Sequence, residues 1–267
     1  MAVTTDGIRS IPGASSAAGA CGSVGAANLA MEPAKQQERS RLGRTGVGHL
    51  LVLYLGFIAI GLGGFLGAGR WDWSAGWLWV IAEGVFAVTL GLVLVFLNPE
   101  LLNERGKRHE GGKPFDKAVM AVFALLEPTL PAVAGLDAVR FGPSSMPDFL
   151  RWPGVALLVV SGAFVLWAMV VNRHAETGVR IQEDRGHQVV TTGPYRIVRH
   201  PMYLGLIVHF VSWPLVLGSW WGMAMAVGLL VLFAVRTALE DRVLRAELAG
   251  YEEYAARTRY RLVPLVW

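Results

Sequence analysis

The chain has 267 residues, of which 54% are hydrophobic and only 16% are charged, and its formal net charge is +4. A soluble domain carries about 25% charged residues, and here the deficit falls in long uncharged runs, so the composition indicates an integral membrane protein. The single cysteine, Cys21, excludes an internal disulfide framework and a multi-cysteine metal site. The basic residues lie in loops between apolar runs, which favours membrane orientation over nucleic-acid binding.

Residues 1–45 differ in composition from the rest of the chain. They are rich in alanine, glycine and serine and contain no sustained apolar run. This composition is typical of a disordered tail, and the segment has no signal-peptide core. Met31 is a second candidate for the start of the protein. The sequence therefore predicts a tail over 1–45, transmembrane helices over 46–172 and a third region over 173–267.

Two long apolar runs follow the tail. Leu50–Gly69 is twenty residues without a charge, enough to cross a bilayer core of about 30 Å. Its glycines predict close packing of a neighbouring helix. Ala75–Leu97 is a second span, interrupted only by Glu83. We interpret Glu83 as a carboxylate near the end of the span that reaches the surface, in preference to a functional group within the membrane.

Two further spans lie in the middle of the chain. Ala118–Leu136 is apolar but contains Pro128 and Pro131, which predict a kinked or partly re-entrant helix. Gly154–Val171 is a fourth span and carries no charge. The sequence between these two spans is a loop with few basic residues.

The last apolar stretch is Leu204–Val235, in which His209 is the only titratable group. As one helix it would be about 48 Å long, too long for a bilayer core, and it is slightly short for two full spans. We therefore predict a tight helical hairpin that turns around residues 213–222. His209 is interpreted as a packed core histidine. The charged, amphipathic pattern over 236–257 predicts a continuing helix.

These elements define an all-α, polytopic membrane protein with four spans and a C-terminal helical hairpin. The basic residues gather in four places, near residues 39–44, 105–117 and 173–199 and at the C-terminus. With this number of spans, all four places fall on one side of the membrane. The positive-inside tendency then puts both termini, and a polar pocket formed by these loops, on the cytoplasmic side.

A polar cluster begins the hairpin, and a second one ends it. Arg236 and Glu240 are four residues apart, so they share one face of a helix. Because the hairpin is antiparallel, His200 and Tyr203 at its start lie opposite Arg236 and Glu240 at its end. The alternative interpretation of this arrangement is an ion pair between Arg199 and Glu240 that only clamps the hairpin.

The residue types in these clusters suit a charged small molecule. The aromatic and histidine side chains of Tyr195, His200 and Tyr203 suit a ligand with an ammonium or sulfonium cation and an aromatic base, and the carboxylates of Glu240 and Asp241 suit its positive charge. Arg236 suits a carboxylate or phosphate. The sequence contains no glycine-rich dinucleotide fingerprint, no P-loop, no metal-ligand pair and no serine nucleophile elbow.

The third region contains an ordered set of motifs. They are His187-x-Val-Val-x-x-Gly193-Pro-Tyr195, Arg199-His-Pro-x-Tyr203-x-Gly205, Arg236-x-x-x-Glu240-Asp241, Gly250-Tyr251-x-x-Tyr254 and Arg261-Leu-x-Pro264. This set resembles the isoprenylcysteine carboxyl methyltransferase family and, more broadly, the membrane methyltransferases that include phospholipid N-methyltransferases. Residues 98–102 and 112–117 resemble a bacterial branch of that family.

The resemblance implies an S-adenosylmethionine-dependent methyltransferase with a cytoplasmic cofactor pocket and a lipid-accessible tunnel. Its acceptor would be a carboxylate of a lipophilic or lipidated substrate. Arg236 would hold that carboxylate and, with Glu240 and His200, form the catalytic group, while positioning supplies most of the rate. The residues implied to line the cofactor pocket are Gln182, His187, Gln188, Val189, Val190, Tyr195, His200, Pro201, Met202, Tyr203 and Glu240.

Other functions stay open on the sequence. N-methylation of a lipid amine needs a base, for which His200 or Glu240 could serve. Nicotinamide-dependent sterol-type reductases share the Arg-His-Pro-x-Tyr run and a Tyr-Arg-x-x-Pro ending, but they carry more spans. A transporter or scaffold is disfavoured because the spans are nearly free of charge and no internal repeat is present. The sequence identifies neither the methyl acceptor nor an oligomeric state.

Overall fold

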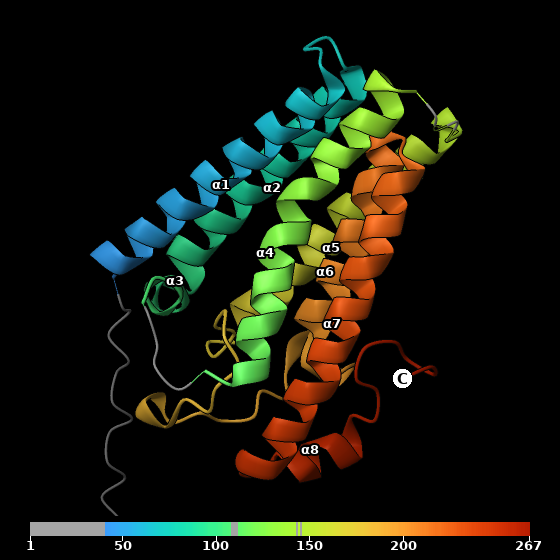
Figure 1. Cartoon of the computed structure of the whole chain (residues 1–267). Coiled ribbons are helices and arrows are strands. Elements are labelled where there is room, and N and C mark those ends of the chain that lie inside the picture. The colour runs from blue at the N-terminus through green and yellow to red at the C-terminus, as the bar shows by residue number, and fades with distance from the viewer. Residues whose placement is uncertain (1–40, 108–111, 143, 145) are drawn as a thin grey trace, which may run out of the picture. The chain divides into compact units, whose positions relative to one another are not determined.

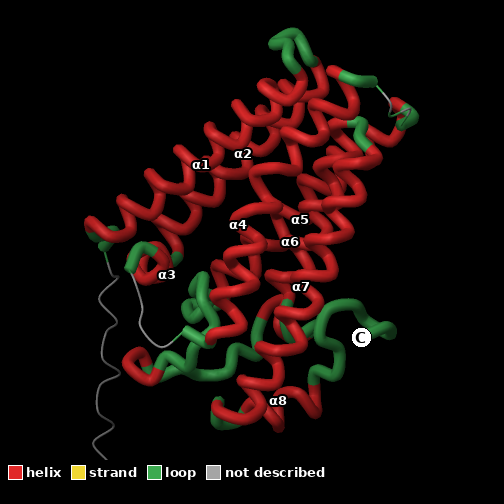
Figure 2. The backbone as a smooth tube through the Cα atoms, in the orientation of Figure 1, coloured by secondary structure: helices red, strands yellow, loops and turns green. Residues whose placement is uncertain are grey.

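A computed structural model describes residues 41–107, 112–142, 144 and 146–267, and its regular elements there are all helices (Figures 1 and 2). Five helices are long and apolar enough to cross a membrane, so the prediction of an all-α polytopic membrane protein is confirmed. The predicted tail, with Met31 and Cys21, lies outside the described residues except for its last five positions.

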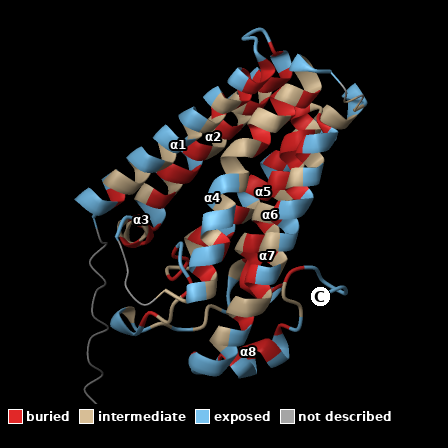
Figure 3. Cartoon of the chain, in the orientation of Figure 1, coloured by how far each residue is buried: buried red, intermediate tan, exposed pale blue. Residues whose placement is uncertain are grey.

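Eight α-helices account for most of the described chain. They are α1 (Arg44–Ala68), α2 (Ser74–Leu97), α3 (Pro99–Arg105), α4 (Pro114–Gly135), α5 (Arg151–Val171), α6 (Pro201–Leu217), α7 (Trp220–Glu247) and α8 (Tyr251–Arg257). A π-helical turn, Leu136–Arg140, extends α4, and short 3-10 turns cover Asp148–Leu150, Glu183–Arg185 and Gly193–Arg196. The outer sides of the long helices expose many leucines, valines and tryptophans, as expected for faces that meet lipid (Figure 3).

The glycines of α1 bring it close to α4. A Cβ at Gly67 would lie 2.1 Å from the Ala132 carbonyl oxygen, and one at Gly135 would lie 2.4 Å from the Gly64 oxygen. Only glycine permits backbones to approach so closely. The prediction that glycines of the first span admit a neighbouring helix is thus confirmed, and the neighbour is α4 although it is far away in sequence.

Helix α4 continues through both of its internal prolines, Pro128 and Pro131. The Thr129 hydroxyl donates to the carbonyl oxygens of Leu125 and Leu126, at 2.8 and 3.1 Å, and so adds side-chain hydrogen bonds to the turn that contains the prolines. With the π-helical turn the helix reaches a length that spans a bilayer. The partly re-entrant form predicted from the prolines is therefore wrong.

The predicted hairpin is confirmed in α6 and α7, which pack against each other. Pro214 lies inside α6, and the chain turns at Gly218, whose φ of 78° is in the left-handed region that favours glycine. Ser219 caps α7 by accepting from the Gly222 amide at 2.8 Å, and its hydroxyl donates to Asp137 at 2.6 Å. The turn is thus anchored to the π-helical turn after α4.

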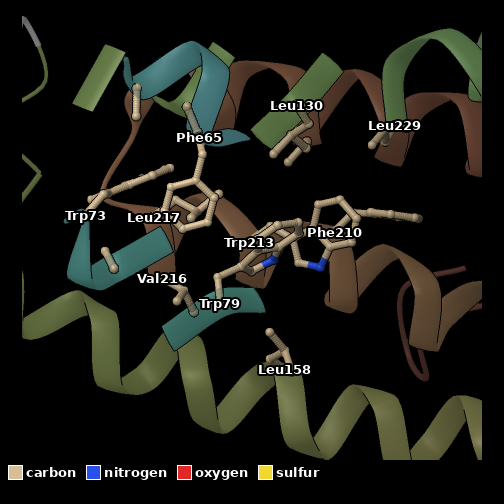
Figure 4. Close-up of a cluster of buried hydrophobic side chains, with 14 of the residues drawn as sticks. Phe65, Trp73, Trp79, Leu130, Leu158, Phe210, Trp213, Val216, Leu217 and Leu229 are labelled. Atoms are coloured by element: carbon tan, nitrogen blue, oxygen red, sulfur yellow. The ribbon is translucent and has the colours of Figure 1, made fainter. Parts of the chain in front are cut away.

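A hydrophobic core joins the hairpin to the other spans (Figure 4). The rings of Trp79 and Trp213 meet edge to face with centroids 5.0 Å apart, and Phe210 packs beside Trp213 at the same distance. Phe65 and Leu130 contribute side chains from α1 and α4. The core therefore contains side chains from helices that are far apart in the sequence.

The Glu83 carboxylate is buried beside this core, with 6% of the residue exposed. It accepts from the Trp213 indole at 2.6 Å and lies 3.0 Å from His209 Nε2. The other ring nitrogen of His209 meets the Ser161 hydroxyl at 3.1 Å. The interpretation of Glu83 as a group that reaches the surface is therefore wrong, whereas His209 is a buried, hydrogen-bonded residue as predicted.

One end of the bundle, which we call the polar end, holds the start of α1, α3, the start of α4 and the end of α7 (Figure 1). The Gly43 amide donates to Asn103 at 2.7 Å there, and Lys113 pairs with Glu247 at 2.6 Å. The Lys113 amide also donates to Val179 of the long loop after α5. Described members of the four basic regions therefore meet at one end. That this end lies on the cytoplasmic side of the membrane stays a prediction.

The chain after α7 departs from the predicted single helix over 236–257. Helix α7 ends at Glu247, and Gly250 adopts a φ of 79° before α8 begins. The glycine permits a reversal that other residues rarely adopt, so α8 turns away from the axis of α7. The final segment then returns to the start of α6, where the amides of Arg199 and His200 donate to its carbonyl oxygens.

Candidate active site

The hairpin is clamped at the polar end by Asp241, which is fully buried. Arg199 donates to both of its carboxylate oxygens, at 2.7 and 3.2 Å, and Arg261 donates at 2.9 Å. The Tyr251 hydroxyl adds a bond at 3.0 Å. A clamping ion pair was one interpretation of this region, but its acid is Asp241 rather than Glu240. The correction matters because it leaves Glu240 available for another role.

Glu240 contacts the other arm of the hairpin through Tyr203, whose hydroxyl donates to it at 2.5 Å. The predicted approach of Tyr203 and Glu240 is thus confirmed. The His200 and Tyr203 rings lie parallel with centroids 5.8 Å apart. His200 Nε2 is 3.5 Å from Asp241, so His200 bridges the clamp and the Tyr203–Glu240 pair.

A cleft at the polar end, which we call the polar cleft, is lined by all but one of the residues implied to bind the cofactor. The exception is Pro201, which begins α6 and does not line it. The polar cleft is bounded by the loop over 172–190, the start of α6, the end of α7 and α8. Its lining includes Gln182, His187, Gln188, Val189, Val190, Tyr195, His200, Met202, Tyr203 and Glu240.

Several lining residues were not among the predicted ones. Tyr251 and Tyr254 come from α8, and the Gly-Tyr-x-x-Tyr motif was a sequence signal that could have identified them. The Tyr254 hydroxyl donates to the Tyr195 carbonyl oxygen at 2.7 Å, which holds α8 against the cleft. His174 and Glu176 also line it, and nothing in the sequence marked them.

The loop wall of the polar cleft carries two histidines in contact, His174 and His187, with ring centroids 4.6 Å apart. Burial, and next the neighbouring His174, lower the pKa of His187 to about 4. Burial also lowers the pKa of His174. Both imidazoles are therefore neutral near pH 7. Both residues line the cleft without adding positive charge to it.

Gln182 organises the same loop and is almost fully buried. Its side-chain amide donates to the His174 carbonyl oxygen at 2.8 Å and its oxygen accepts from Arg185 at 2.8 Å. Arg180 binds Glu176 at 3.0 Å on the rim. Since both ends of the Gln182 amide are already bonded, Gln182 shapes the wall of the cleft.

A second, larger space lies between the spans. This apolar cavity has a volume of about 410 Å³ and is lined mainly by aliphatic and aromatic side chains of α1, α2, α4, α5, α6 and α7. Polar groups occur in two places along it. Arg105 and Arg236 are among the lining residues from the polar end, and Glu83, Glu127 and His209 are those from the middle of the spans.

The polar cleft and the apolar cavity share a wall. Glu176, Met202 and Tyr203 line both spaces. Glu240 lines only the cleft, and Arg236 lines only the cavity. The two residues predicted to share a helix face therefore serve different compartments, and the side chain of Tyr203 lies between them.

Arg236 is held firmly at this wall and is 5% exposed. Its Nε lies 2.9 Å from Asp116, and its Nη2 donates to the Thr177 carbonyl oxygen at 2.6 Å. The centre of its guanidinium is 5.1 Å from the centroid of the Tyr203 ring. Nε and the facing Asp116 oxygen are nevertheless misaligned and have no satisfied hydrogen bond. Arg236 thus already has a carboxylate partner, which the sequence did not reveal.

The fold and these two spaces define a polytopic helical membrane protein in which a polar cleft meets an apolar cavity at one wall. Residues 149–249 match the family model described as phospholipid methyltransferase. The matched segment runs from the turn before α5 to just beyond α7 and includes Tyr203, Arg236 and Glu240. No curated protein matches the chain. The match supports a membrane methyltransferase, and its description names phospholipids and not isoprenylcysteine.

Proposed function

We propose that the protein is an S-adenosylmethionine-dependent methyltransferase that methylates a carboxylate of a lipophilic substrate. The observation that carries this proposal is the shared wall at Tyr203. A carboxylate, Glu240, faces the polar cleft, and a guanidinium, Arg236, faces the apolar cavity. A cationic donor on one side and an anionic, lipid-soluble acceptor on the other would match these charges.

The residues of the polar cleft have the charge and the aromatic character that the donor requires. Glu240 and the ring of Tyr203 would favour a sulfonium or ammonium cation, and the neutral His187 would not oppose it. When bound, S-adenosylmethionine supplies a methyl group on a positively charged sulfur. The cleft has a volume of about 90 Å³, below the roughly 300 Å³ of a typical small-molecule site, so we expect its walls to part when the donor binds.

On the cavity side, Arg236 would orient the acceptor. Transfer of the methyl group would replace the donor's C–S bond with a C–O bond, with the electron pair left on sulfur, so the residues of this chain would not have to move a proton. Two opposite charges disappear together, which a low-dielectric site favours. The chain would then contribute mainly alignment of the two reactants and exclusion of water. Because Asp116 offsets part of the Arg236 charge, the main role of Arg236 would be to orient the acceptor.

A second candidate is N-methylation of a phospholipid amine, favoured by the description of the matching family. In that reaction the cavity guanidiniums would bind the lipid phosphate, and the amine would need to lose a proton. His200 is engaged with Asp241 and Tyr251, so Glu240 is the better placed base. The reductase and the non-enzymatic alternatives lack a comparable observation in their favour.

Labelling with a radioactive methyl donor separates the candidates. Membrane extracts are incubated with the donor, with and without the purified protein, and the labelled lipids are treated with mild base. We expect a protein-dependent label that base releases as methanol, because methyl esters are base-labile. A base-stable label on an amine would favour the second candidate. If no protein-dependent label appears and S-adenosylhomocysteine does not bind in isothermal titration, the methyltransferase proposal is wrong.

A further inference from the structure

Arg105 is the last residue of α3, and its side chain lines the apolar cavity. Its Nε donates to the Ala175 carbonyl oxygen at 2.8 Å, and its Nη2 approaches the Met202 sulfur at 3.7 Å. Among the described residues, no carboxylate lies within ion-pair distance of it. By contrast, Arg236 has Asp116 and Arg180 has Glu176.

An unpaired guanidinium beside an apolar cavity is costly. Burial lowers the pKa of Arg105 to about 10, and the positive charge of Arg236 acts in the same direction. A partly buried cation with no counter-ion among the described residues loses hydration that its neutral hydrogen bonds replace only in part. An anion that enters the cavity would recover part of this loss, and the cavity walls would bury its apolar chain.

Arg105 and Arg236 are positioned by the same short segment. The Ala175 oxygen holds one guanidinium, and the Thr177 oxygen, two residues further on, holds the other. Two residues of chain span at most about 7 Å, so the two anchoring oxygens are close together. Arg105 also touches Met202, which belongs to the wall shared with the polar cleft.

We propose that Arg105 is an acceptor-binding residue, whose guanidinium binds the anionic group of a single lipophilic molecule in the apolar cavity. The ligand class is an amphiphile with a carboxylate or phosphate head and a long apolar chain. Arg236 is already offset by Asp116, whereas Arg105 has no ion pair among the described residues, so Arg105 supplies the less compensated positive charge. Arg105 therefore governs affinity for the acceptor, and Arg236 governs its orientation. This inference rests on one part of the proposed function, namely that the acceptor binds in the apolar cavity.

The test uses the full-length protein in mild detergent with a photoreactive fatty acid and its methyl ester. Crosslinking yield at cavity residues is measured by mass spectrometry, with dodecanoate, dodecyl phosphate and dodecanol as competitors. We expect the acid to label about tenfold more than the ester, as for one charge-assisted hydrogen bond. Dodecanoate and dodecyl phosphate, but not dodecanol, should compete, and the stronger of the two identifies the preferred head group.

Substitution of Arg105 should remove this preference. In Arg105→Gln the acid should label no better than the ester, whereas Arg105→Lys should keep part of the difference. Lys107→Gln is the matched control, because Lys107 pairs with Glu104 and does not line the cavity. Thermal melting of each variant verifies folding, and if Arg105→Gln does not fold, the comparison of acid and ester in the wild-type protein and in Arg105→Lys carries the test.

Two results would overturn the inference. One is equal labelling by acid and ester in the wild-type protein, and the other is an unchanged ratio in a folded Arg105→Gln variant. A preference for the acid that depends on Arg105, without methyl transfer to any carboxylate, would instead contradict the proposed function and leave this inference in place.

Discussion

Tyr203 is the residue at which the two compartments of the protein meet. Its hydroxyl donates to Glu240 on the side of the polar cleft, and its ring faces the guanidinium of Arg236 on the side of the cavity. The helical spacing and the antiparallel hairpin were enough to predict that these three residues meet. The sequence could not show that Tyr203 separates the other two, because that depends on side-chain direction.

The same limit explains why Arg199 was paired with the wrong acid. Glu240 and Asp241 are adjacent, and one step along a helix turns the side chain by about 100°. Either carboxylate is compatible with a clamp when only spacing is known. The structure buries Asp241 among the basic and phenolic groups of the returning C-terminal segment, a contact that no local pattern indicates.

Replacing Arg236 tests the proposed orientation of the acceptor. Arg236→Lys keeps a positive charge beside Asp116 but loses the planar, two-pronged donor geometry. We expect a higher KM, a lower kcat and a fall of about tenfold or more in kcat/KM, with binding of S-adenosylhomocysteine retained. Initial rates and isothermal titration measure these quantities. A collapse of cofactor affinity instead would show that Arg236 does not belong to the acceptor side.

Asp241 and Glu240 should differ sharply when each loses its charge. Asp241→Asn leaves the buried Arg199 without its anion, so we expect a loss of about 3–5 kcal/mol in stability. Glu240→Gln should fold normally, because within the described chain the Glu240 carboxylate makes a single hydrogen bond, with the Tyr203 hydroxyl, and it should weaken cofactor binding. Thermal melting in detergent and isothermal titration check the pair. Equal melting temperatures for the two variants would contradict the assignment of the clamp.

The neutral His187 predicts a stability that depends on pH. Its pKa is about 4 in the folded protein and near 6.5 when unfolded, so between these values the unfolded state binds more protons. Stability should therefore fall as the pH drops from 6.5 towards 4, and the nearby His174, Arg180 and Arg185 reinforce this direction. Melting temperatures at pH 7.5 and 5 should differ less in His187→Gln. An identical difference in both proteins would rule out this contribution.

At the scale of elements, uncharged length predicted the spans well, whereas their pairing and the end of the last helix were not predictable. The charged pattern over 236–257 continues across Gly250, so periodicity gave no reason to expect the break. The break requires a left-handed glycine, and many glycines in helices are not breaks. Contact between α1 and α4 likewise depends on the whole bundle and not on either helix alone.

Two glycines of α1 provide a matched test of that contact. A Cβ at Gly67 would clash with the backbone of Ala132, whereas one at Gly56 would meet nothing within 4 Å. Gly67→Ala should therefore lower the melting temperature by separating α1 from α4, at a cost of about 1–3 kcal/mol. Gly56→Ala should be neutral or slightly stabilising. Similar effects of both substitutions would mean that the helices do not approach closely at Gly67.

At the scale of the whole molecule, the distribution of basic residues predicts orientation. Arg257 ends α8, which lies at the polar end, and Phe141 directly follows the π-helical turn that extends α4 at the opposite end. Both are exposed. In a Cys21→Ser background, Phe141→Cys should react with a membrane-impermeant maleimide in intact bacterial cells, and Arg257→Cys only after lysis. The reverse pattern would contradict the predicted cytoplasmic polar end.

The wall shared by the polar cleft and the apolar cavity has a consequence for how reactants enter and leave the protein. If the two reactants occupy the two spaces, the cosubstrate enters and leaves through water, while the lipophilic substrate enters by lateral diffusion from the bilayer. Because the two routes are separate, a demethylated cosubstrate could be exchanged for a fresh one while the lipid product is still bound. Such an arrangement would let one lipid be modified more than once during a single visit, provided that it offers another site to methylate.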